Sequence, residues 1–122
     1  ATLREARESE AAQVWAVFQP HLYSRTRDMH RELGAALALA DRVVVTDVYG
    51  SRETPIPGVT GQLVADAARR AGGAVEYVPH RGDVAAHLAG LAQTGDLVVT
   101  MGAGDITLVA AELARELGAM AR

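Results

Sequence analysis

Residues 14–27 read VWAVFQPHLYSRTR, an apolar run followed at once by a polar segment. The apolar part, Val14 to Phe18, has the length and the β-branched content of a strand. Its apolarity is nearly continuous rather than alternating, which is typical of a strand covered on both faces, as in parallel sheets. The stretch therefore predicts a buried strand that leads into a segment rich in hydroxyl, imidazole and guanidinium groups.

The rest of the chain repeats this strand-then-helix pattern. Three further apolar runs have strand length, namely 43–48, 74–78 and 97–100. Four stretches place apolar residues at helical spacing, namely 27–40, 59–71, 83–92 and 105–120, with Asp83 and Asp105 as predicted N-caps. Such alternation predicts right-handed crossovers and a parallel sheet. We predict an α/β fold, a Rossmann-like three-layer sandwich with a mostly parallel sheet and helices on both faces, in one domain over 1–122. A further helical stretch is expected at 1–10.

Composition excludes several function classes. The 122 residues carry 15 acidic and 12 basic side chains, a net charge of -3, so bulk charge predicts no nucleic-acid partner. All basic residues are Arg and there is no Cys. The chain thus has no P-loop lysine, Schiff-base amine or thiol nucleophile. No apolar run approaches the roughly 18 residues that span a bilayer, so we expect a cytoplasmic protein without a membrane partner.

The segment after the first strand is the first candidate binding segment, because ligands of open parallel sheets bind beyond the carboxyl ends of the strands. A helix N-terminus favours an anion, and an Arg adds a fork that matches a carboxylate. In the alternative interpretation, Ser24 or Thr26 only caps the helix and the arginines form a solvated face. The candidate residues for a small substrate are His21, Tyr23, Ser24, Arg25, Thr26 and Arg27.

The second candidate segment follows the next strand and opens an irregular loop, YGSRETPIPG at 49–58. Its prolines block helix and central strand alike, and such a loop beyond a strand is typical of binding loops. Asp47, Tyr49 and Glu53 are the candidates here; the carboxylates would orient an amine, bind a metal through water, or pair with the first segment's arginines. The alternative is a salt-bridged surface loop.

The third candidate segment, TMGAGDI at 100–106, leads from a strand through glycines into a helix. Gly102 and Gly104 would allow a backbone to approach an anion or nucleotide closely. We favour the other interpretation, a tight strand-to-helix turn capped by Asp105, because the third glycine of GxGxxG is missing and an acidic residue at a helix start opposes an anion. His30, His80 and His87 lack the spacing of metal ligands, so no metal site is predicted. Trp15 is expected in the core.

These segments resemble the C-terminal domain of the Mur ligases. VFQPHLYSRTRD, DVYGSRETPIPGV and DLVVTMGAGDIT occur in the family's order and spacing, in particular that of members that join L-alanine to UDP-N-acetylmuramate in peptidoglycan synthesis. The Ala-rich, Lys-free composition resembles actinobacterial members. The resemblance implies a three-domain enzyme, in which this domain closes over an N-terminal UDP-sugar domain and a central ATPase domain of the same chain.

The resemblance also implies the chemistry and the site. ATP, with Mg²⁺, phosphorylates the muramate carboxylate, and the amine of L-alanine then attacks the acyl phosphate. In the run from His21 to Arg27, Arg25 would hold the L-alanine carboxylate and His21 would orient it or touch the substrate. Leu22 stands where the family often has Arg. The remaining matches to the second and third motifs are Asp47, Tyr49, Glu53, Gly102, Gly104 and Asp105.

Two expectations concern the isolated chain. The family's DDYxHHPTE segment, which helps to bind the nucleotide, is expected before residue 1, so we predict a fragment with no catalytic residue, no ligase activity and no strong ATP binding of its own. The alternative that the residues leave open is a free-standing, Rossmann-like regulatory module that binds a small anion at the helix start beside Arg25.

Overall fold

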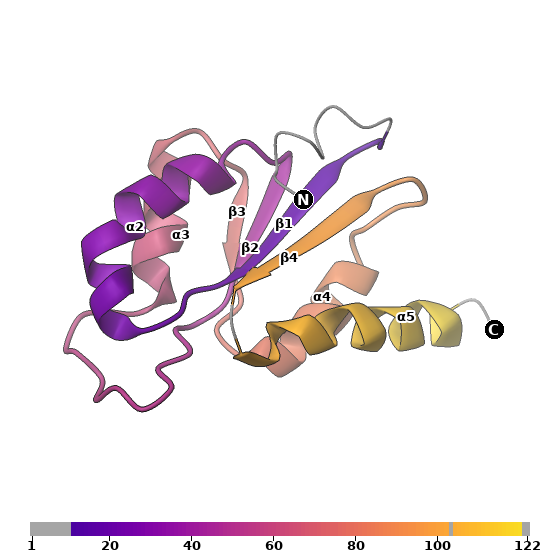
Figure 1. Ribbon diagram of the computed structural model, residues 1–122. Coiled ribbons are helices and arrows are strands. Elements are labelled where there is room, and N and C mark those ends of the chain that lie inside the picture. The colour runs from indigo at the N-terminus through magenta and orange to yellow at the C-terminus, as the bar shows by residue number, and fades with distance from the viewer. Residues whose placement is uncertain (1–10, 103, 121–122) are drawn as a thin grey trace.

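The sheet has the predicted parallel arrangement. The computed structural model describes residues 11–102 and 104–120. Its strands are β1 (Val14–Gln19), β2 (Arg42–Val45), β3 (Val75–Tyr77) and β4 (Leu97–Gly102), in the order β3-β2-β1-β4 (Figure 1). All three neighbouring pairs are parallel. The chain moves outward from β1 to β2 and β3 and then crosses to the other side of β1 to form β4, so the strand order reverses beside β1.

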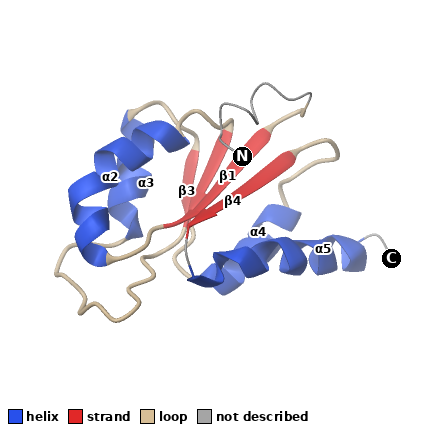
Figure 2. Cartoon of the chain, in the orientation of Figure 1, coloured by secondary structure: helices blue, strands red, loops and turns tan. Residues whose placement is uncertain are grey.

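Helices cover both faces of the sheet, which confirms the three-layer prediction (Figures 1 and 2). One face carries α2 (Tyr23–Leu37) and α3 (Gly61–Arg70), and the other carries α4 (Val84–Ala89) and α5 (Val109–Met120). Short 3₁₀ turns precede the last two helices, η1 (Arg81–Asp83) and η2 (Gly104–Leu108). None of the helices in the described ranges is long and apolar enough to cross a membrane. The helix expected at 1–10 lies outside the described residues.

The continuous apolarity of β1 reflects two separate cores. Successive side chains of a strand point to opposite faces. Val14 and Ala16 therefore join the core beneath α2 and α3, while Trp15 and Val17 join the core beneath α4 and α5. Trp15 is buried, donates its indole N–H to Asp96 at 3.0 Å, and lies under the Arg42 guanidinium at 4.4 Å from the ring centroid. The predicted core role of Trp15 is confirmed.

The helices α2 and α3 approach each other closely at Gly34. This glycine is buried, and a Cβ built on it would lie 2.5 Å from the Cβ of Ala67 and 2.6 Å from the backbone nitrogen of Ala68. Real Cβ atoms essentially never come within 3.0 Å of another atom. Only glycine fits at this crossing, so it fixes the position of α2, the helix that carries the first candidate segment.

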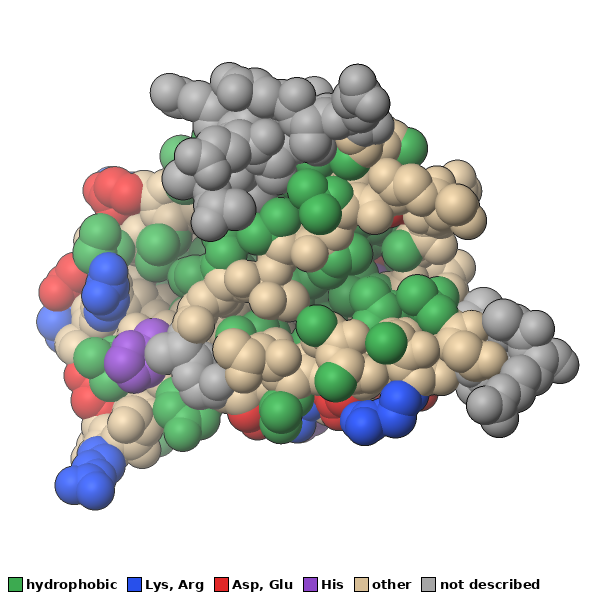
Figure 3. Space-filling view, turned by 45° about the vertical axis from the view of Figure 1, so that its right-hand side comes forward, with side chains coloured by type: hydrophobic (Ala, Val, Ile, Leu, Met, Phe, Trp, Pro, Cys, Tyr) green, Lys and Arg blue, Asp and Glu red, His purple; other side chains and the backbone are tan. Residues whose placement is uncertain are grey.

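Apolar side chains also gather on the side of the molecule where β4 and α5 lie (Figure 3). A cavity of about 440 Å³ on this side is lined by residues of both elements, including Val98, Leu113 and Leu117. Leu97 and Leu117 are among the exposed large apolar residues. The polar candidate segments lie elsewhere, at the carboxyl ends of the strands.

Several predicted boundaries are wrong, and α2 is the most consequential case. It begins at Tyr23, four residues before the predicted start, and ends at Leu37 rather than Ala40. Leu22 has φ 67°, its N–H donates to Tyr49 O at 3.0 Å, and its own carbonyl accepts from Thr26 N at 3.1 Å. The chain thus turns sharply at Leu22, and the polar residues 23–27 form the first turns of a helix instead of a loop.

The two predicted aspartate caps have different outcomes. Asp83 occupies the predicted N-cap position of α4, although its side chain makes no capping hydrogen bond. Asp105 lies inside η2, and α5 starts only at Val109, so the predicted Asp105 cap is wrong. The Asp105 side chain is used for long-range contacts instead, as described below. The predicted strand 43–48 ends at Val45, because Asp47 Oδ1 draws the amides of Val48 and Gly61 to itself at 2.8 and 3.0 Å.

Candidate functional site

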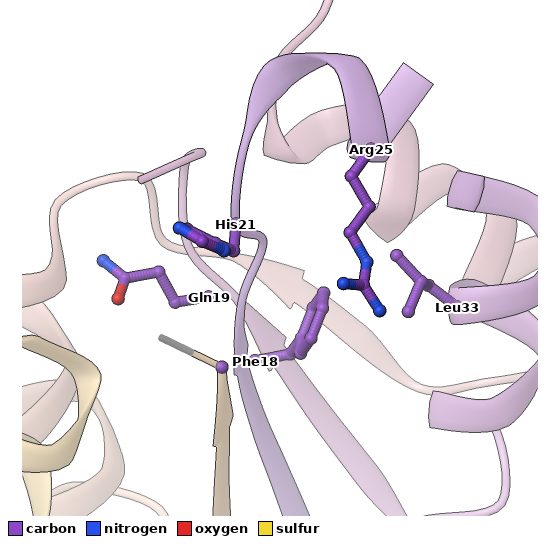
Figure 4. Close-up of a pocket in the computed structure, with 6 residues that line it drawn as sticks. Phe18, Gln19, His21, Arg25 and Leu33 are labelled. Atoms are coloured by element: carbon purple, nitrogen blue, oxygen red, sulfur yellow. The ribbon is translucent and has the colours of Figure 1, made fainter. Parts of the chain in front are cut away.

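A pocket lies where β1 and β4 end side by side. Its volume is about 230 Å³, and it is lined by Phe18, Gln19, His21, Arg25, Leu33 and Gly102 (Figure 4). Gln19 and Gly102 are register partners at the ends of the two strands. Beyond this pair, β1 leads to α2 on one face, whereas β4 leads to η2 and α5 on the other. The connections part here, which opens a crevice at the point where ligands of open α/β sheets bind.

Gly102 is required by the backbone at this crevice. It has φ 127°, and a Cβ on it would lie 2.4 Å from the carbonyl oxygen of Gln19. The sequence predicts that Gly102 allows a close approach of the backbone to a ligand. In the structure Gly102 instead allows β4 to lie close to the Gln19 carbonyl of the neighbouring strand β1. Gly104 lies in η2.

Arg25 supplies the positive charge of the pocket. It lies in the first turn of α2, and its guanidinium group lies between Phe18 and Leu33 (Figure 4). No acidic partner of Arg25 is found among the described residues. Arg27, by contrast, points to solvent and pairs with Asp28 at 2.9 Å, so it does not line the pocket. The geometry therefore presents one arginine to a ligand in this pocket.

His21 forms a second polar wall. Its backbone pairs with Tyr49 in an isolated parallel bridge, and the two rings lie 6.2 Å apart. Tyr49 is exposed beside it. Of the six candidates in the first segment, the structure brings His21 and Arg25 together in the pocket and leaves the other four outside its lining.

The start of α2 is already occupied by a carboxylate of this chain. Glu53 Oε1 accepts hydrogen bonds from the backbone amides of Tyr23 and Ser24, and Glu53 Oε2 accepts one from the Ser24 hydroxyl. The Ser24 hydroxyl bond, followed by the two amides, lowers the pKa of Glu53. These two amides and the Ser24 hydroxyl are therefore not available to a substrate anion, and the prediction that they bind one is wrong.

Thr26, Asp47 and Glu53 form hydrogen bonds within the chain rather than lining the pocket. The Thr26 hydroxyl is buried and donates to Leu22 O at 2.7 Å. Asp47 binds the amide at the start of α3 and lies near Tyr77, and burial followed by the Asp47 charge raises the pKa of Tyr77 to about 12. Neither Asp47 nor Glu53 forms an ion pair with an arginine of the first segment in the described structure. Both carboxylates act as helix caps.

Asp105 links the end of β1 to the opposite helix layer. Its Oδ1 accepts from Gln19 Nε2 at 3.1 Å, and its Oδ2 lies 3.2 Å from Arg81 Nε. Arg81 is also paired with Glu112 of α5. The Gln19 bond, and next the Arg81 charge, lower the pKa of Asp105. Sequence reasoning missed Gln19 as a site residue, although a polar side chain that ends an otherwise apolar strand was the available signal.

The other histidines lie where the sequence places them. His30 is in α2, His80 follows β3, and His87 is in α4, where its Nε2 lies 2.9 Å from Glu76. Within residues 11–102 and 104–120, no three His, Asp or Glu side chains are grouped so that they could hold a metal ion. The residues present therefore give no basis for assigning the chain a role in holding Mg²⁺.

Comparisons with known proteins show the family to which the chain belongs. Residues 1–104 match the family described as "Mur ligase, glutamate ligase domain". The chain belongs to the Mur ligase family. Among its relatives, the UDP-N-acetylmuramate–L-alanine ligase of Cutibacterium acnes is 58% identical over 111 residues, which cover 89% of this chain. The enzyme of that name from Mycolicibacterium smegmatis is 49% identical over 120 residues, or 96% of this chain.

These Mur ligase relatives are much longer than the chain, which spans 24% of the length of each. Both are actinobacterial, in line with the resemblance seen in the sequence. Two solved structures share the fold. The UDP-N-acetylmuramate-alanine ligase of Thermotoga maritima has a TM-score of 0.68 at 24% identity, with 97% of this chain and 23% of that chain covered. The murein peptide ligase of Psychrobacter arcticus has a TM-score of 0.71 at 21% identity, with 95% and 24% covered.

Proposed function

We propose that the chain is the C-terminal domain of an ATP-dependent ligase that joins L-alanine to UDP-N-acetylmuramate in peptidoglycan synthesis, and that its pocket binds L-alanine. The observation that carries the proposal is the Arg25 guanidinium, which lacks an acidic partner in the described structure and lines a pocket at the reversal of strand order. The high identity to ligases of that name supports the choice of substrate.

The pocket has the size and chemistry for a small amino acid. Its volume of about 230 Å³ greatly exceeds the share of one water molecule, about 30 Å³. Arg25 presents parallel N–H donors to a carboxylate, which is the geometry of a bidentate pair. Phe18 and Leu33 flank the guanidinium group and offer apolar contact to a small side chain. A free-standing anion module at the α2 start is disfavoured, because Glu53 fills that position.

In the proposed reaction, ATP activates the sugar carboxylate as an acyl phosphate, and the amine of L-alanine attacks the acyl carbon while phosphate leaves. The residues of this chain bind the amino acid and aim its amine. We assign ATP, Mg²⁺ and the UDP-sugar to the other two domains of the same polypeptide, and we place the enzyme in the cytoplasm. Closure of this domain over them would bring the amine to the acyl phosphate.

The test uses the full-length enzyme. Arg25→Ala should raise the KM for L-alanine about ten- to a hundredfold, the effect of losing a charged hydrogen bond, and should leave the KM for ATP nearly unchanged. Arg31→Ala is the matched control, since Arg31 is exposed on the same helix and does not line the pocket. Equal L-alanine kinetics in the two variants would overturn the proposal.

A further inference from the structure

Arg25 is exposed, and it owes its place at the pocket to the first turn of α2, in which it is the third residue. The first amides of a helix have no acceptor within the helix, so this turn depends on another group that binds them. The residue at the N-cap is Leu22, whose side chain makes no capping hydrogen bond. The position of Arg25 therefore depends on an acceptor from elsewhere in the chain.

Glu53 of the loop at 49–58 supplies this acceptor. One oxygen of its carboxylate accepts hydrogen bonds from the backbone amides of Tyr23 and Ser24, and the other accepts one from the Ser24 hydroxyl. The loop also contacts the Tyr23 ring, since a Cβ on Gly50 would lie 2.4 Å from a carbon of that ring. The start of α2 is thus held by a loop that does not itself line the pocket.

The bonds of Glu53 also keep its carboxylate from pairing with Arg25. A carboxylate free to pair with the Arg25 guanidinium would compete with the carboxylate of a substrate. Both oxygens of Glu53 are instead bonded to Tyr23 and Ser24. Glu53 and Arg25 form no ion pair in the part of the chain that the structure describes, so the guanidinium group is available to a ligand.

We propose that Glu53 is a positioning residue for substrate binding, which holds the first turn of α2 so that Arg25 faces the pocket with its guanidinium group unpaired. This inference rests on the proposed function and gives the loop at 49–58 a part in the affinity for L-alanine. Without the Glu53 cap, only a fraction of the molecules would present Arg25 in the binding position. The apparent affinity for L-alanine falls in proportion to that fraction.

The test measures the kinetics of the full-length ligase. Glu53→Ala should raise the KM for L-alanine about three- to tenfold, which is less than the effect of Arg25→Ala because the guanidinium group is still present. The KM for ATP and kcat should stay within about twofold of the wild type. An unchanged KM for L-alanine in Glu53→Ala would overturn the proposal.

Thr60→Ala is the matched control, because it removes a cap from a helix that does not carry the pocket arginine. The Thr60 hydroxyl accepts a hydrogen bond from Gln62 N at 3.2 Å at the start of α3, and no residue of α3 lines the pocket. Thr60→Ala should destabilise the chain as the loss of a cap does, yet leave the KM for L-alanine within about twofold. If this KM rises as much as in Glu53→Ala, the effect is one of general stability and the proposal is wrong.

A double variant shows whether Glu53 acts through Arg25. Once Arg25 is removed, the position of the first turn should no longer matter for the substrate carboxylate. Arg25→Ala/Glu53→Ala should therefore have the KM for L-alanine of Arg25→Ala alone, within about twofold. Effects of the two single variants that multiply in the double variant would refute a role through Arg25.

Glu53→Asp covers the case in which Glu53→Ala does not fold. It keeps the negative charge but shortens the side chain by one methylene group, so the carboxylate no longer reaches the amides of Tyr23 and Ser24 from the same loop position. The KM for L-alanine should rise about two- to fivefold although the charge is kept. An unchanged KM would show that the reach of the carboxylate has no effect on binding, which contradicts the proposal.

The same data separate the two proposals. If Arg25→Ala leaves the KM for L-alanine unaffected, the amino-acid site itself is wrong. If Arg25→Ala raises this KM while the Glu53 variants do not, only the inference about Glu53 fails.

Discussion

Adding a single methyl group at Gly34 tests whether the contact between α2 and α3 is as tight as the structure shows. The new Cβ would lie 2.5 Å from the Cβ of Ala67, whereas ordinary contact begins at 3.4 Å. The helices must therefore separate by about 1 Å, since a close-packed interior leaves no space to absorb the methyl group. The second neighbour, at 2.6 Å, is the backbone nitrogen of Ala68, which cannot rotate away.

The expected cost follows from two opposing effects. Overpacking a core typically costs about 1–3 kcal/mol, while Ala in a helix is favoured over Gly by about 1 kcal/mol. Because two of the clashing neighbours are backbone atoms, the overpacking cost should fall in the upper part of its range, at about 2–3 kcal/mol. Gly34→Ala should therefore lower the free energy of unfolding by about 1–2 kcal/mol, which corresponds to a fall in Tm of roughly 4–10 °C. Urea denaturation, followed by circular dichroism and by the fluorescence of the single tryptophan, measures this difference.

Gly118 provides the matched control. It lies in α5, and a Cβ there would meet nothing within 4 Å. Gly118→Ala should stabilise the chain by about 0.5–1 kcal/mol through helix propensity alone. Combining Gly34→Ala with Ala67→Gly should restore only part of the lost stability, because the clash with backbone remains. If Gly34→Ala stabilises the chain as Gly118→Ala does, the reasoning about the crossing is refuted.

Three further predictions concern single side chains. The hydrogen bond from Ser24 lowers the pKa of Glu53 in the folded chain. The ionised carboxylate therefore stabilises the folded chain fully above the ordinary pKa of about 4.3, and this contribution is lost as the pH falls through the folded pKa. The stability difference between wild type and Glu53→Gln, measured by urea denaturation, should accordingly shrink on acidification. Arg42→Met should cost about 0.5–1 kcal/mol and shift the fluorescence of Trp15, because a cation over its ring is removed. Tyr77 should titrate at about 12 by ultraviolet absorbance; since the unfolded phenol ionises near 10, its contribution to stability should be complete below pH 10 and lost as the pH rises toward 12.

The element types could be predicted because they depend on patterns within each segment. The nearly unbroken apolarity of Val14 to Phe18 correctly indicated a strand covered on both faces, and β1 does lie between two cores. The location of the candidate site followed from the same reasoning, because the carboxyl ends of parallel strands are its general position. His21 and Arg25 were found in this way.

The helix starts could not be predicted, because their partners are distant in the sequence. A search for a local cap at α2 considers Ser24 or Thr26, yet the capping carboxylate comes from Glu53, 30 residues after Tyr23. Asp105 is a residue type that often caps the helix that follows it. Its hydrogen-bond partner Gln19, however, is 86 residues away. Gln19 itself becomes visible as a site residue only once the strand register places it beside Gly102.

The cap that Glu53 places on α2 also limits how the loop at 49–58 is able to change in length. Surface loops usually accept insertions at little cost, because the closure entropy grows only slowly with loop length. Here the carboxylate must reach the amides of both Tyr23 and Ser24, and the loop is joined again at its start by the Leu22 N–H bond to Tyr49 O. Only the three residues between Tyr49 and Glu53 separate these two attachment points. Insertions between Tyr49 and Glu53 should therefore destabilise the start of α2 more than insertions of equal length between Glu53 and Pro55.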